Sequence, residues 1–521
     1  MKYFNPVISG FYPDPSVCTD GDKYYLVTST FQYFPGVALF ESDDLINWEP
    51  IGSVLTRESQ LPLADSGASG GIFAPTIRYN DGTFYMVTTN VSAGGNFYVT
   101  TNDIHGEWSE PIFVEQGGID PSLYFEGDKA YFMSNGEDDD GNGGITQCEI
   151  DIKTGKKLTK SKVIWQGAGG RYLESPHLYK INDQYYIMAA EGGTEYGHMV
   201  VYAKGDNING PFENYAKNPV LTNRNLGGYG IQGCGHADLV QRKDGSWWMV
   251  HLAFRQLGEY DTYHTTGRET YLVPVNFDED GWFTAGDESG TTRHIMEVDG
   301  LHASVEVAQP RGTMYSFANT KFGREWVCQK NPEMSNYDLS EKGLKLIPSK
   351  INISQINESP SMLLIRQKEM TGSFAVFLKP SIGESGVTVF MDELHHYDLA
   401  VVKGEKNKLI FKQTVGPYIS SETKSVELTD EQMQIISEDG IILSVEMSNY
   451  EYHFFADFEG ELIDMGKAAA KYVSTEVAGG FTGVMFGLYA FCEQLDVKLK
   501  NVAEFSDLLV EYTDQLRFEE G

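Results

Sequence analysis

Acidic residues and one histidine recur at one position of a repeated sequence. Five stretches share a short apolar run, a Gly, Asn or Asp turn and an aromatic run. They are "PDPSVCTDGDKYYLVTS", "FAPTIRYNDGTFYMVTT", "IDPSLYFEGDKAYFMSN", "ESPHLYKINDQYYIMAA" and "GHADLVQRKDGSWWMVHL". When the stretches are aligned on their Pro or Ala, the preceding residues are Asp14, Ala74, Asp120, Ser175 and His236. Glu174 lies directly before Ser175.

These residue types could perform acid and base catalysis. A single Asp before Pro needs no function, because Asp is a common turn former. Three acids at or beside one repeat position are harder to explain as turns. Like charges gathered in a partly desolvated funnel oppose ionisation, so one carboxyl group stays protonated near neutral pH while another stays charged. Glycoside hydrolysis uses such a pair.

The spacing of the repeat indicates the fold that would bring these residues together. Each unit has the strand, turn and strand pattern of a β-hairpin. The aligned positions 15, 75, 121, 176 and 237 are 60, 46, 55 and 61 residues apart, which suits blades of about 40 to 50 residues with some long loops. A solenoid or a sandwich could also repeat hairpins, but a repeat that stops after five units favours a closed five-bladed β-propeller. Its innermost strands would gather the acids at one mouth of the channel.

The repeat ends near residue 305, and a second domain follows. Apolar strands from "SMLLIRQKEM" to "GFTGVMFGLYA" have the spacing of a β-sandwich. We therefore predict an all-β chain with a five-bladed β-propeller at residues 1–305 and a C-terminal β-sandwich at 306–521. The boundary is expected between His302 and Phe322, where "VAQPRGT" supplies Pro and Gly.

Composition excludes several classes of partner. The formal charge of -34 opposes binding to nucleic acid or anionic membranes, so a neutral substrate is expected. The five cysteines are far apart and show no CxxC spacing, which indicates reduced thiols and no zinc site. No apolar segment resembles a signal peptide or a membrane span. We expect a cytoplasmic protein, although removal of a signal peptide would leave the same sequence.

The motifs resemble a known family. "NPVISGFYPDPSV", "GGIFAPTIRY", "GIDPSL", "ESPHLY", "AEGGTEYGHM", "GCGHADLV" and "GRETYLVPV" are similar to the two-domain β-xylosidases and α-L-arabinofuranosidases of glycoside hydrolase family 43. The resemblance covers nearly the whole chain. It implies a propeller followed by a concanavalin-like sandwich that packs on it and lends a loop to the active-site rim. It also implies exo-acting, inverting hydrolysis of pentose-containing oligosaccharides by a homodimer or homotetramer, with no cofactor needed for the chemistry.

The resemblance also assigns roles to single residues. Asp14 matches the general base that activates water, and Glu174 matches the general acid that protonates the leaving oxygen. Asp120 matches the residue that positions this acid and tunes its pKa. Arg268 matches the arginine that binds the sugar in the innermost subsite. His236 matches a channel histidine that faces a calcium ion, so a structural calcium ion is expected there.

Three aromatic residues are candidates for the pocket walls, and they bear on specificity. Phe31 and Phe73 match wall positions, and Phe481 in "GGFTG" is a candidate rim residue whose alternative role is packing. Xylosidases of the family carry Trp at the position of Phe73 and another Trp in the loop that is "SNGEDDDGNGG" here. The sequence therefore favours an α-L-arabinofuranosidase acting on hemicellulose- or arabinan-derived oligosaccharides, with a β-D-xylosidase or a dual activity as the alternative.

Two other functions are compatible with the same fold. Retaining fructan-cleaving propellers would need "NDPNG" and "RDP" motifs, and the sequence has neither. A non-catalytic sugar-binding propeller would need a pocket without its acids, whereas the aligned positions supply three. The sequence therefore favours a glycosidase.

Overall fold

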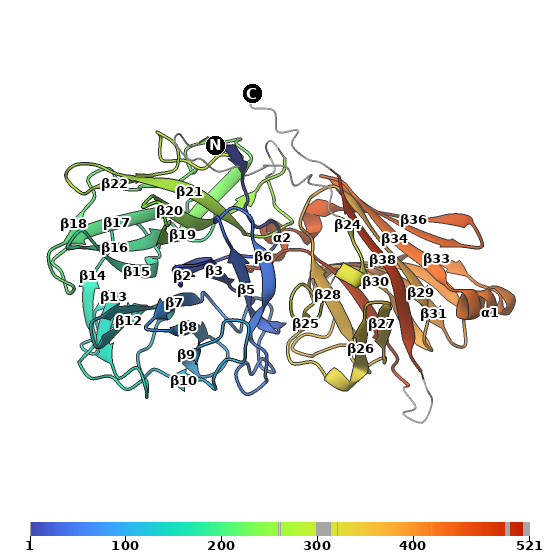
Figure 1. Cartoon of the computed structure of the whole chain (residues 1–521). Helices are drawn as coiled ribbons and strands as arrows, with labels where there is room; N and C mark the ends of the chain where they lie inside the picture. The colour runs from blue at the N-terminus through green and yellow to red at the C-terminus, as the bar shows by residue number, and fades with distance from the viewer. Residues whose placement is uncertain are drawn as a thin grey trace.

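The computed structural model describes residues 2–258, 260, 262–297, 314–319, 321–417, 419–494 and 501–513. Figure 1 shows a ring of sheets, coloured blue to green, beside a layered body coloured yellow to red. The predicted boundary at residue 305 and His302 lie outside the described residues. No helix among the described residues is long and apolar enough to cross a membrane.

Within the described residues, the N-terminal part of the chain forms five antiparallel sheets of four strands. The first strands of neighbouring sheets contact one another around the ring, as the inner strands of propeller blades do. The blades are β2 (Ser16–Thr19), β3 (Tyr24–Thr28), β5 (Gly36–Ser42) and β6 (Glu49–Leu55); β7 (Thr76–Asn80), β8 (Thr83–Asn90), β9 (Gly95–Thr101) and β10 (Ile112–Phe113); β11 (Ile119–Glu126), β12 (Lys129–Glu137), β13 (Gly143–Ile150) and β14 (Lys162–Trp165); β15 (Glu174–Ile181), β16 (Gln184–Glu191), β17 (Met199–Gly205) and β18 (Glu213–Asn214); and β19 (Ile231–Gln241), β20 (Trp247–Arg255), β21 (Glu269–Phe277) and β22 (Phe283–Ala285). The predicted five-bladed propeller is confirmed.

The five repeated stretches are the hairpins formed by the first two strands of each blade. In four of the five blades the second strand is buried over most of its length, because each blade packs between two others. In β20, for example, every residue after Trp247 is buried. β1 (Lys2–Phe4) pairs with β23 (Ile295–Glu297), so the first and last strands of the propeller lie side by side.

The C-terminal part forms two packed sheets within the described residues. One has the order β26-β27-β38-β29-β34-β35-β36 with β24 beside β38, and the other has the order β28-β37-β30-β31-β32-β33. Buried residues alternate with more accessible ones in β29 and β38, as in a sandwich core. The elements are β24 (Met314–Tyr315), η1 (Phe317–Asn319), β25 (Cys328–Gln329), η2 (Met334–Asn336), β26 (Tyr337–Ser340), β27 (Gly343–Leu346), β28 (Met362–Arg366), β29 (Gly372–Lys379), β30 (Gly383–Asp392), β31 (His395–Lys403), β32 (Lys408–Val415), β33 (Ile419–Glu427), α1 (Asp430–Asp439), β34 (Ile441–Met447), β35 (Glu451–Phe458), β36 (Glu461–Ala469), η3 (Ala470–Val473), α2 (Thr475–Ala478), β37 (Met485–Phe491) and β38 (Ala503–Tyr512).

The sandwich packs directly on the propeller. β25 pairs with β4 (Tyr33–Phe34) of the propeller. Arg255, which is buried, binds Glu269 of its own blade and Glu369 of the sandwich. A buried charge needs such partners, since an unpaired one would be costly. These contacts place the segment that follows α2 at the propeller mouth.

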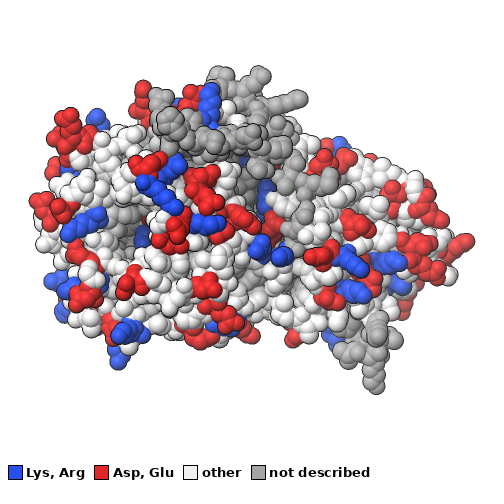
Figure 2. Space-filling model, in the orientation of Figure 1, with Lys and Arg blue, Asp and Glu red and all other residues white. Residues whose placement is uncertain are grey.

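The cysteines are free thiols, as the sequence predicts, and charged side chains cover the surface. All five cysteines are buried and free. On the face shown in Figure 2, acidic and basic side chains are interspersed over both bodies.

Candidate active site

A backbone kink occurs at the head of four blades, at the positions that the repeat aligned. Asp14, Asp120, Ser175 and His236 have φ values of 56°, 52°, 57° and 48°. Residues other than glycine adopt this left-handed conformation only where the surrounding structure holds it, which is common at functional sites. The strand register is interrupted at the same places in β11, β15 and β19.

The kink explains why the acid of the fourth blade precedes the aligned position. Ser175 takes the left-handed conformation there, and Glu174 is the first residue of β15. Ala74, in the second blade, is not among the residues with positive φ. The structure therefore gathers three carboxyl groups and one imidazole at the channel mouth from four different blades.

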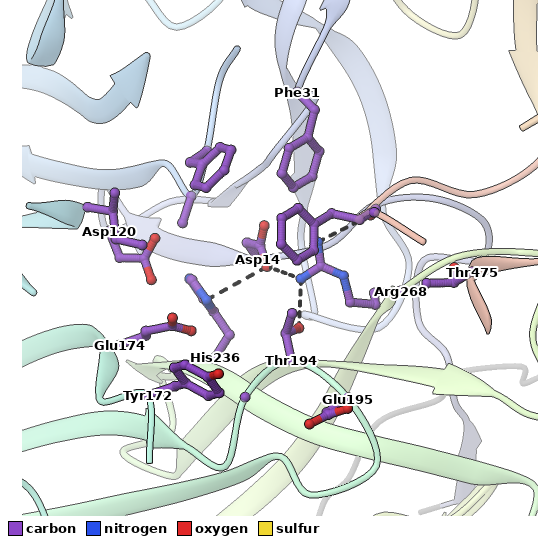
Figure 3. A pocket seen from close by; sticks show the side chains of 16 residues that line it. Asp14, Phe31, Asp120, Tyr172, Glu174, Thr194, Glu195, His236, Arg268 and Thr475 are labelled. Atoms are coloured by element: carbon purple, nitrogen blue, oxygen red, sulfur yellow. Dashed lines mark hydrogen bonds and ion pairs between the residues drawn. The ribbon is translucent and has the colours of Figure 1, made fainter. Parts of the chain in front are cut away.

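All eight residues that the sequence nominated line one pocket of about 410 Å³. They are the acids Asp14, Asp120 and Glu174, together with His236, Arg268, Phe31, Phe73 and Phe481. Figure 3 shows the carboxyl groups of Asp14, Asp120 and Glu174 around the same space. Phe481 comes from the sandwich, so both bodies contribute to the pocket.

Asp14 is held in its charged form. Burial raises its pKa, but Arg268, His236, the Ser29 hydroxyl and His198 outweigh that effect, and the pKa of Asp14 lies below its usual value. Arg268 Nη1 donates to Asp14 Oδ1 at 2.8 Å, and Ser29 Oγ donates to Oδ2 at 2.5 Å. A carboxylate with these partners can accept a proton from water while remaining fixed in position.

Glu174 and Asp120 have the opposite electrostatic surroundings. Burial, with the charge of Asp14, raises the pKa of Glu174 to about 7 although Arg268 opposes the shift. Burial and the neighbouring carboxyl groups of Glu174 and Asp14 also raise the pKa of Asp120. Asp120 Oδ2 accepts a hydrogen bond from the backbone N–H of Ser175 at 3.1 Å. Asp120 therefore holds the start of the strand that carries Glu174.

Three phenylalanine rings form one wall of the pocket. The ring of Phe31 lies 5.4 Å from that of Phe73 and 5.7 Å from that of Phe481, measured between centroids. The Arg268 guanidinium lies 5.7 Å and 5.5 Å from the rings of Phe31 and Phe481. Phe481 is also bound through its backbone, because its N–H donates to Ser69 Oγ and its carbonyl accepts from Arg268. Phe481 thus has both a packing role and a place on the rim.

Comparison with known proteins decides the family. The model of "Glycosyl hydrolases family 43" matches residues 3–283, which is more than half of the chain. The chain belongs to glycoside hydrolase family 43. Residues 315–511 match the "Beta xylosidase C-terminal Concanavalin A-like domain". This family 43 chain is therefore a glycosidase with the propeller and sandwich arrangement that its sequence predicted.

Several relatives are similar to this family 43 glycosidase over most of their length. The non-reducing end α-L-arabinofuranosidase BoGH43B of Bacteroides ovatus is 39% identical over 498 residues, which are 93% of this chain and 90% of the relative. A xylosidase/arabinosidase of Butyrivibrio fibrisolvens is 38% identical over 93% of this chain and 95% of its own. Among solved structures, the Bacteroides ovatus xyloglucan PUL GH43B superimposes with a TM-score of 0.88 at 37% identity, covering 98% of this chain and 100% of that one.

Side chains from the first strands of four blades form a hydrogen-bonded cluster in this glycosidase. Arg78 binds the buried Asp238 through Nη1 at 2.7 Å and Nη2 at 3.1 Å, and its Nη2 lies 2.8 Å from His177 Nδ1. Asp238 also accepts hydrogen bonds from the hydroxyl groups of Ser16 and Tyr179. We call these five side chains the axial cluster.

The expected calcium ion has little support from these residues. Calcium binds six to eight oxygen atoms, but both oxygens of Asp238 are already used by the axial cluster and a backbone N–H. His236 Nδ1 lies 3.7 Å from Asp14 Oδ1, and burial lowers the pKa of His236. The described residues contain no group of three or more His, Cys, Asp or Glu that could hold a metal. These side chains do not fit direct binding of calcium, and calcium facing His236 stays a prediction of the resemblance.

The pocket also contains residues that the sequence analysis did not nominate. They are Ala74, Ile119, Tyr172, Gly193, Thr194, Glu195, Thr475 and Gly480. Thr194 accepts a hydrogen bond from Arg268 at 2.9 Å. The quoted "AEGGTEYGHM" motif contained Thr194 and Glu195, but no repeat position marked them. The loop 134–144, which lacks the second family Trp, contributes no residue to the lining.

Proposed function

We propose that this glycosidase is an exo-acting, inverting α-L-arabinofuranosidase that releases terminal pentoses from hemicellulose- or arabinan-derived oligosaccharides. One observation carries the proposal: in a single pocket, the pKa of Asp14 lies below its usual value and the pKa of Glu174 is raised to about 7. A charged base and a protonated acid are what a single displacement by water requires.

The reaction follows from these two protonation states. Asp14 removes a proton from a water molecule, whose oxygen attacks the anomeric carbon on the face opposite the leaving group. Glu174 donates its proton to the glycosidic oxygen as that bond breaks, so the leaving sugar departs as an alcohol. The first-formed pentose therefore has the inverted configuration. Such a reaction places the two carboxyl groups about 6.5 to 9.5 Å apart, leaving room for the water.

Arg268 is proposed to orient the terminal sugar. Its Nη atoms bind Asp14, Thr194 and the Phe481 carbonyl, while its buried Nε has no hydrogen-bond partner among the described residues. A buried donor without a partner is costly, and a sugar hydroxyl could satisfy it. A pocket of about 410 Å³ has the size of a small-ligand site. This size supports release of single terminal units over binding along a polymer.

The aromatic wall and the relatives support a preference for arabinofuranosides. Phe73 stands where xylosidases of the family carry Trp, so the wall offers a flat pyranose ring less contact. BoGH43B, at 39% identity, is named as an α-L-arabinofuranosidase. We expect aryl α-L-arabinofuranoside to have a higher kcat/KM than aryl β-D-xyloside. The ratio should be about 10 to 200-fold, which is the discrimination that one apolar contact in a pocket supplies.

Side-by-side kinetics on the two aryl glycosides tests this preference. Phe73→Trp should narrow the gap between the two values of kcat/KM, and Phe113→Trp, at an exposed ring outside the pocket, serves as a matched control. A clear preference for the xyloside in the unmodified enzyme would overturn the arabinofuranosidase assignment. It would favour the second candidate, a β-D-xylosidase, which has support from the xylosidase-type sandwich and from the dual name of the Butyrivibrio relative.

Assembly and location follow from the resemblance and from the cysteines. We propose a homodimer or homotetramer, since the resemblance implies one, that acts in the cytoplasm, where buried free cysteines such as those found here stay reduced. Light scattering during gel filtration measures the mass of the assembly, and a mass of one 58.1 kDa chain would contradict it. A chain of formal charge -34 is expected to bind neither nucleic acid nor membranes.

A further inference from the structure

Tyr172 is an aromatic residue that lines the pocket and yet is largely exposed. It is 61% exposed, and it lies two residues before Glu174. Its backbone φ of 54° is in the left-handed region, which a tyrosine rarely adopts without support. A surface tyrosine alone needs no explanation, but a strained one at the mouth of a catalytic pocket does.

The loop that carries Tyr172 is held by a buried carboxylate. Glu191 is 1% exposed and accepts hydrogen bonds from the backbone N–H groups of Ala168, Gly169 and Gly170. Three charge-assisted hydrogen bonds to consecutive amides fix the path of the chain. The loop is therefore preorganised.

The ring of Tyr172 is supported from behind. A Cβ atom added to Gly193 would lie 3.0 Å from Tyr172 Cδ2, so the ring rests against the Gly193 backbone. The Arg171 guanidinium lies 5.1 Å from the ring centroid, and it binds Glu195 and the Gly192 carbonyl. Tyr172 as a whole remains 61% exposed in spite of these contacts.

The position of Tyr172 indicates which part of a substrate would meet it. A general acid protonates the oxygen that joins the released sugar to its leaving group, so the surface beside Glu174 toward solvent faces the leaving group. Tyr172 and Glu174 line the same pocket, and Figure 3 draws Tyr172 on the side of Glu174 and Phe31 on the other side of Asp14. The phenylalanine wall and Tyr172 thus flank different parts of the pocket.

We propose that Tyr172 is the aromatic platform for the sugar ring on the leaving-group side of the bond that is cleaved. The apolar C–H face of a sugar stacks on an open tyrosine ring, and a rigid ring loses little freedom on binding. This inference rests on the proposed function, because it places the leaving group beside Glu174. It assigns the recognition of a second sugar to a residue outside the phenylalanine wall.

Two substrates that differ in their leaving groups test the platform. A pentose disaccharide such as α-1,5-linked arabinobiose has a sugar ring to stack, whereas α-L-arabinofuranosyl fluoride has a single leaving atom. For Tyr172→Ala we expect KM for the disaccharide to rise about tenfold with kcat little changed, because stacking is equal in the ground and transition states. The loss of kcat/KM on the disaccharide should exceed that on the fluoride at least about fivefold.

Two further variants complete the test. Tyr172→Phe retains the ring and should restore the KM for the disaccharide. Tyr450→Ala removes a tyrosine that is 70% exposed and lies outside the pocket. This variant should leave kcat and KM unchanged for both substrates. Equal losses on both substrates for Tyr172→Ala, or no loss on either, would overturn the platform. If the unmodified enzyme cleaves neither substrate, the proposed function is overturned, and the platform with it.

Discussion

Asp14 and Glu174 differ in their nearest charged partners, and this difference sets the pH range of activity. Asp14 binds the Arg268 guanidinium, whereas Glu174 is buried and lies near the charge of Asp14. We expect kcat/KM for a pentose disaccharide to rise as Asp14 loses its proton below about pH 4. It should fall around pH 7, where Glu174 loses its own. Initial rates from pH 3 to 9 measure both limbs.

Asp120→Asn should move the alkaline limb to lower pH. The Asp120 and Glu174 pair releases its last proton late because each carboxyl group opposes ionisation of the other. Removing one carboxyl group makes Glu174 easier to ionise, while Asn retains an oxygen acceptor for the Ser175 N–H. The same pH profile on the variant measures the shift. If the alkaline limb does not move, Asp120 does not tune the pKa of Glu174. Its role would then be limited to the hydrogen bond with the Ser175 backbone.

Glu174→Gln should discriminate between leaving groups. The arabinose that leaves from arabinobiose needs protonation, and an activated aryl group does not. The variant should therefore lose about 100 to 10,000-fold in kcat on the disaccharide and far less on the aryl glycoside. Asp14→Asn is the matched comparison, since loss of the base should slow both substrates alike. Equal losses on both substrates for Glu174→Gln would show that Glu174 binds and does not donate a proton.

At the scale of the elements, hydrogen bonds join the first strands of four blades to one another. The axial cluster joins side chains from β2, β7, β15 and β19. Arg78, His177 and the Ser16 hydroxyl lower the pKa of Asp238 despite its burial. Asp14 lies just before β2, Glu174 is the first residue of β15 and His236 lies in β19, so three of these strands also position residues of the site. The rigidity of the cluster therefore supports the geometry of the site.

Asp238→Asn should destabilise the fold by about 3 to 5 kcal/mol, the usual cost of removing one partner of a buried ion pair. Glu110→Gln, which breaks an exposed pair with Arg57, is the control and should cost less than about 1 kcal/mol. Urea unfolding at pH 7 measures both. Because the pKa of Asp238 is lowered in the folded state, its contribution is present at neutral pH and is lost as the pH falls below about 4. Equal, small effects of the two variants would contradict this account of the cluster.

At the scale of the whole molecule, the two bodies complete one pocket. Phe481 belongs to the sandwich, but it packs against Phe31 and binds Ser69 and Arg268 of the propeller. Glu476 of α2 binds His264 and Tyr196 of the propeller close by. The rim of the pocket therefore depends on the docking of the sandwich.

How far the sequence predicts this arrangement depends on whether a residue belongs to the repeat. Asp14, Asp120 and His236 occupy the repeated position, so alignment alone brought them together. Arg268 and the phenylalanine wall required the family resemblance. Tyr172 and Thr194 lie in connections between strands, and no local pattern marks them. The path of the Tyr172 loop depends on Glu191, a carboxylate 19 residues further along the sequence, and such long-range contacts are visible only in the folded chain.

The stereochemistry of the first product tests the central claim most directly. Proton NMR during hydrolysis of an α-L-arabinofuranoside distinguishes the anomer released by the enzyme before mutarotation mixes the two. If Asp14 activates water and Glu174 protonates the leaving oxygen, the β-anomer of L-arabinofuranose appears first. Appearance of the α-anomer first would mean that the configuration is retained, and it would contradict the assignment of Asp14 as the base that activates water.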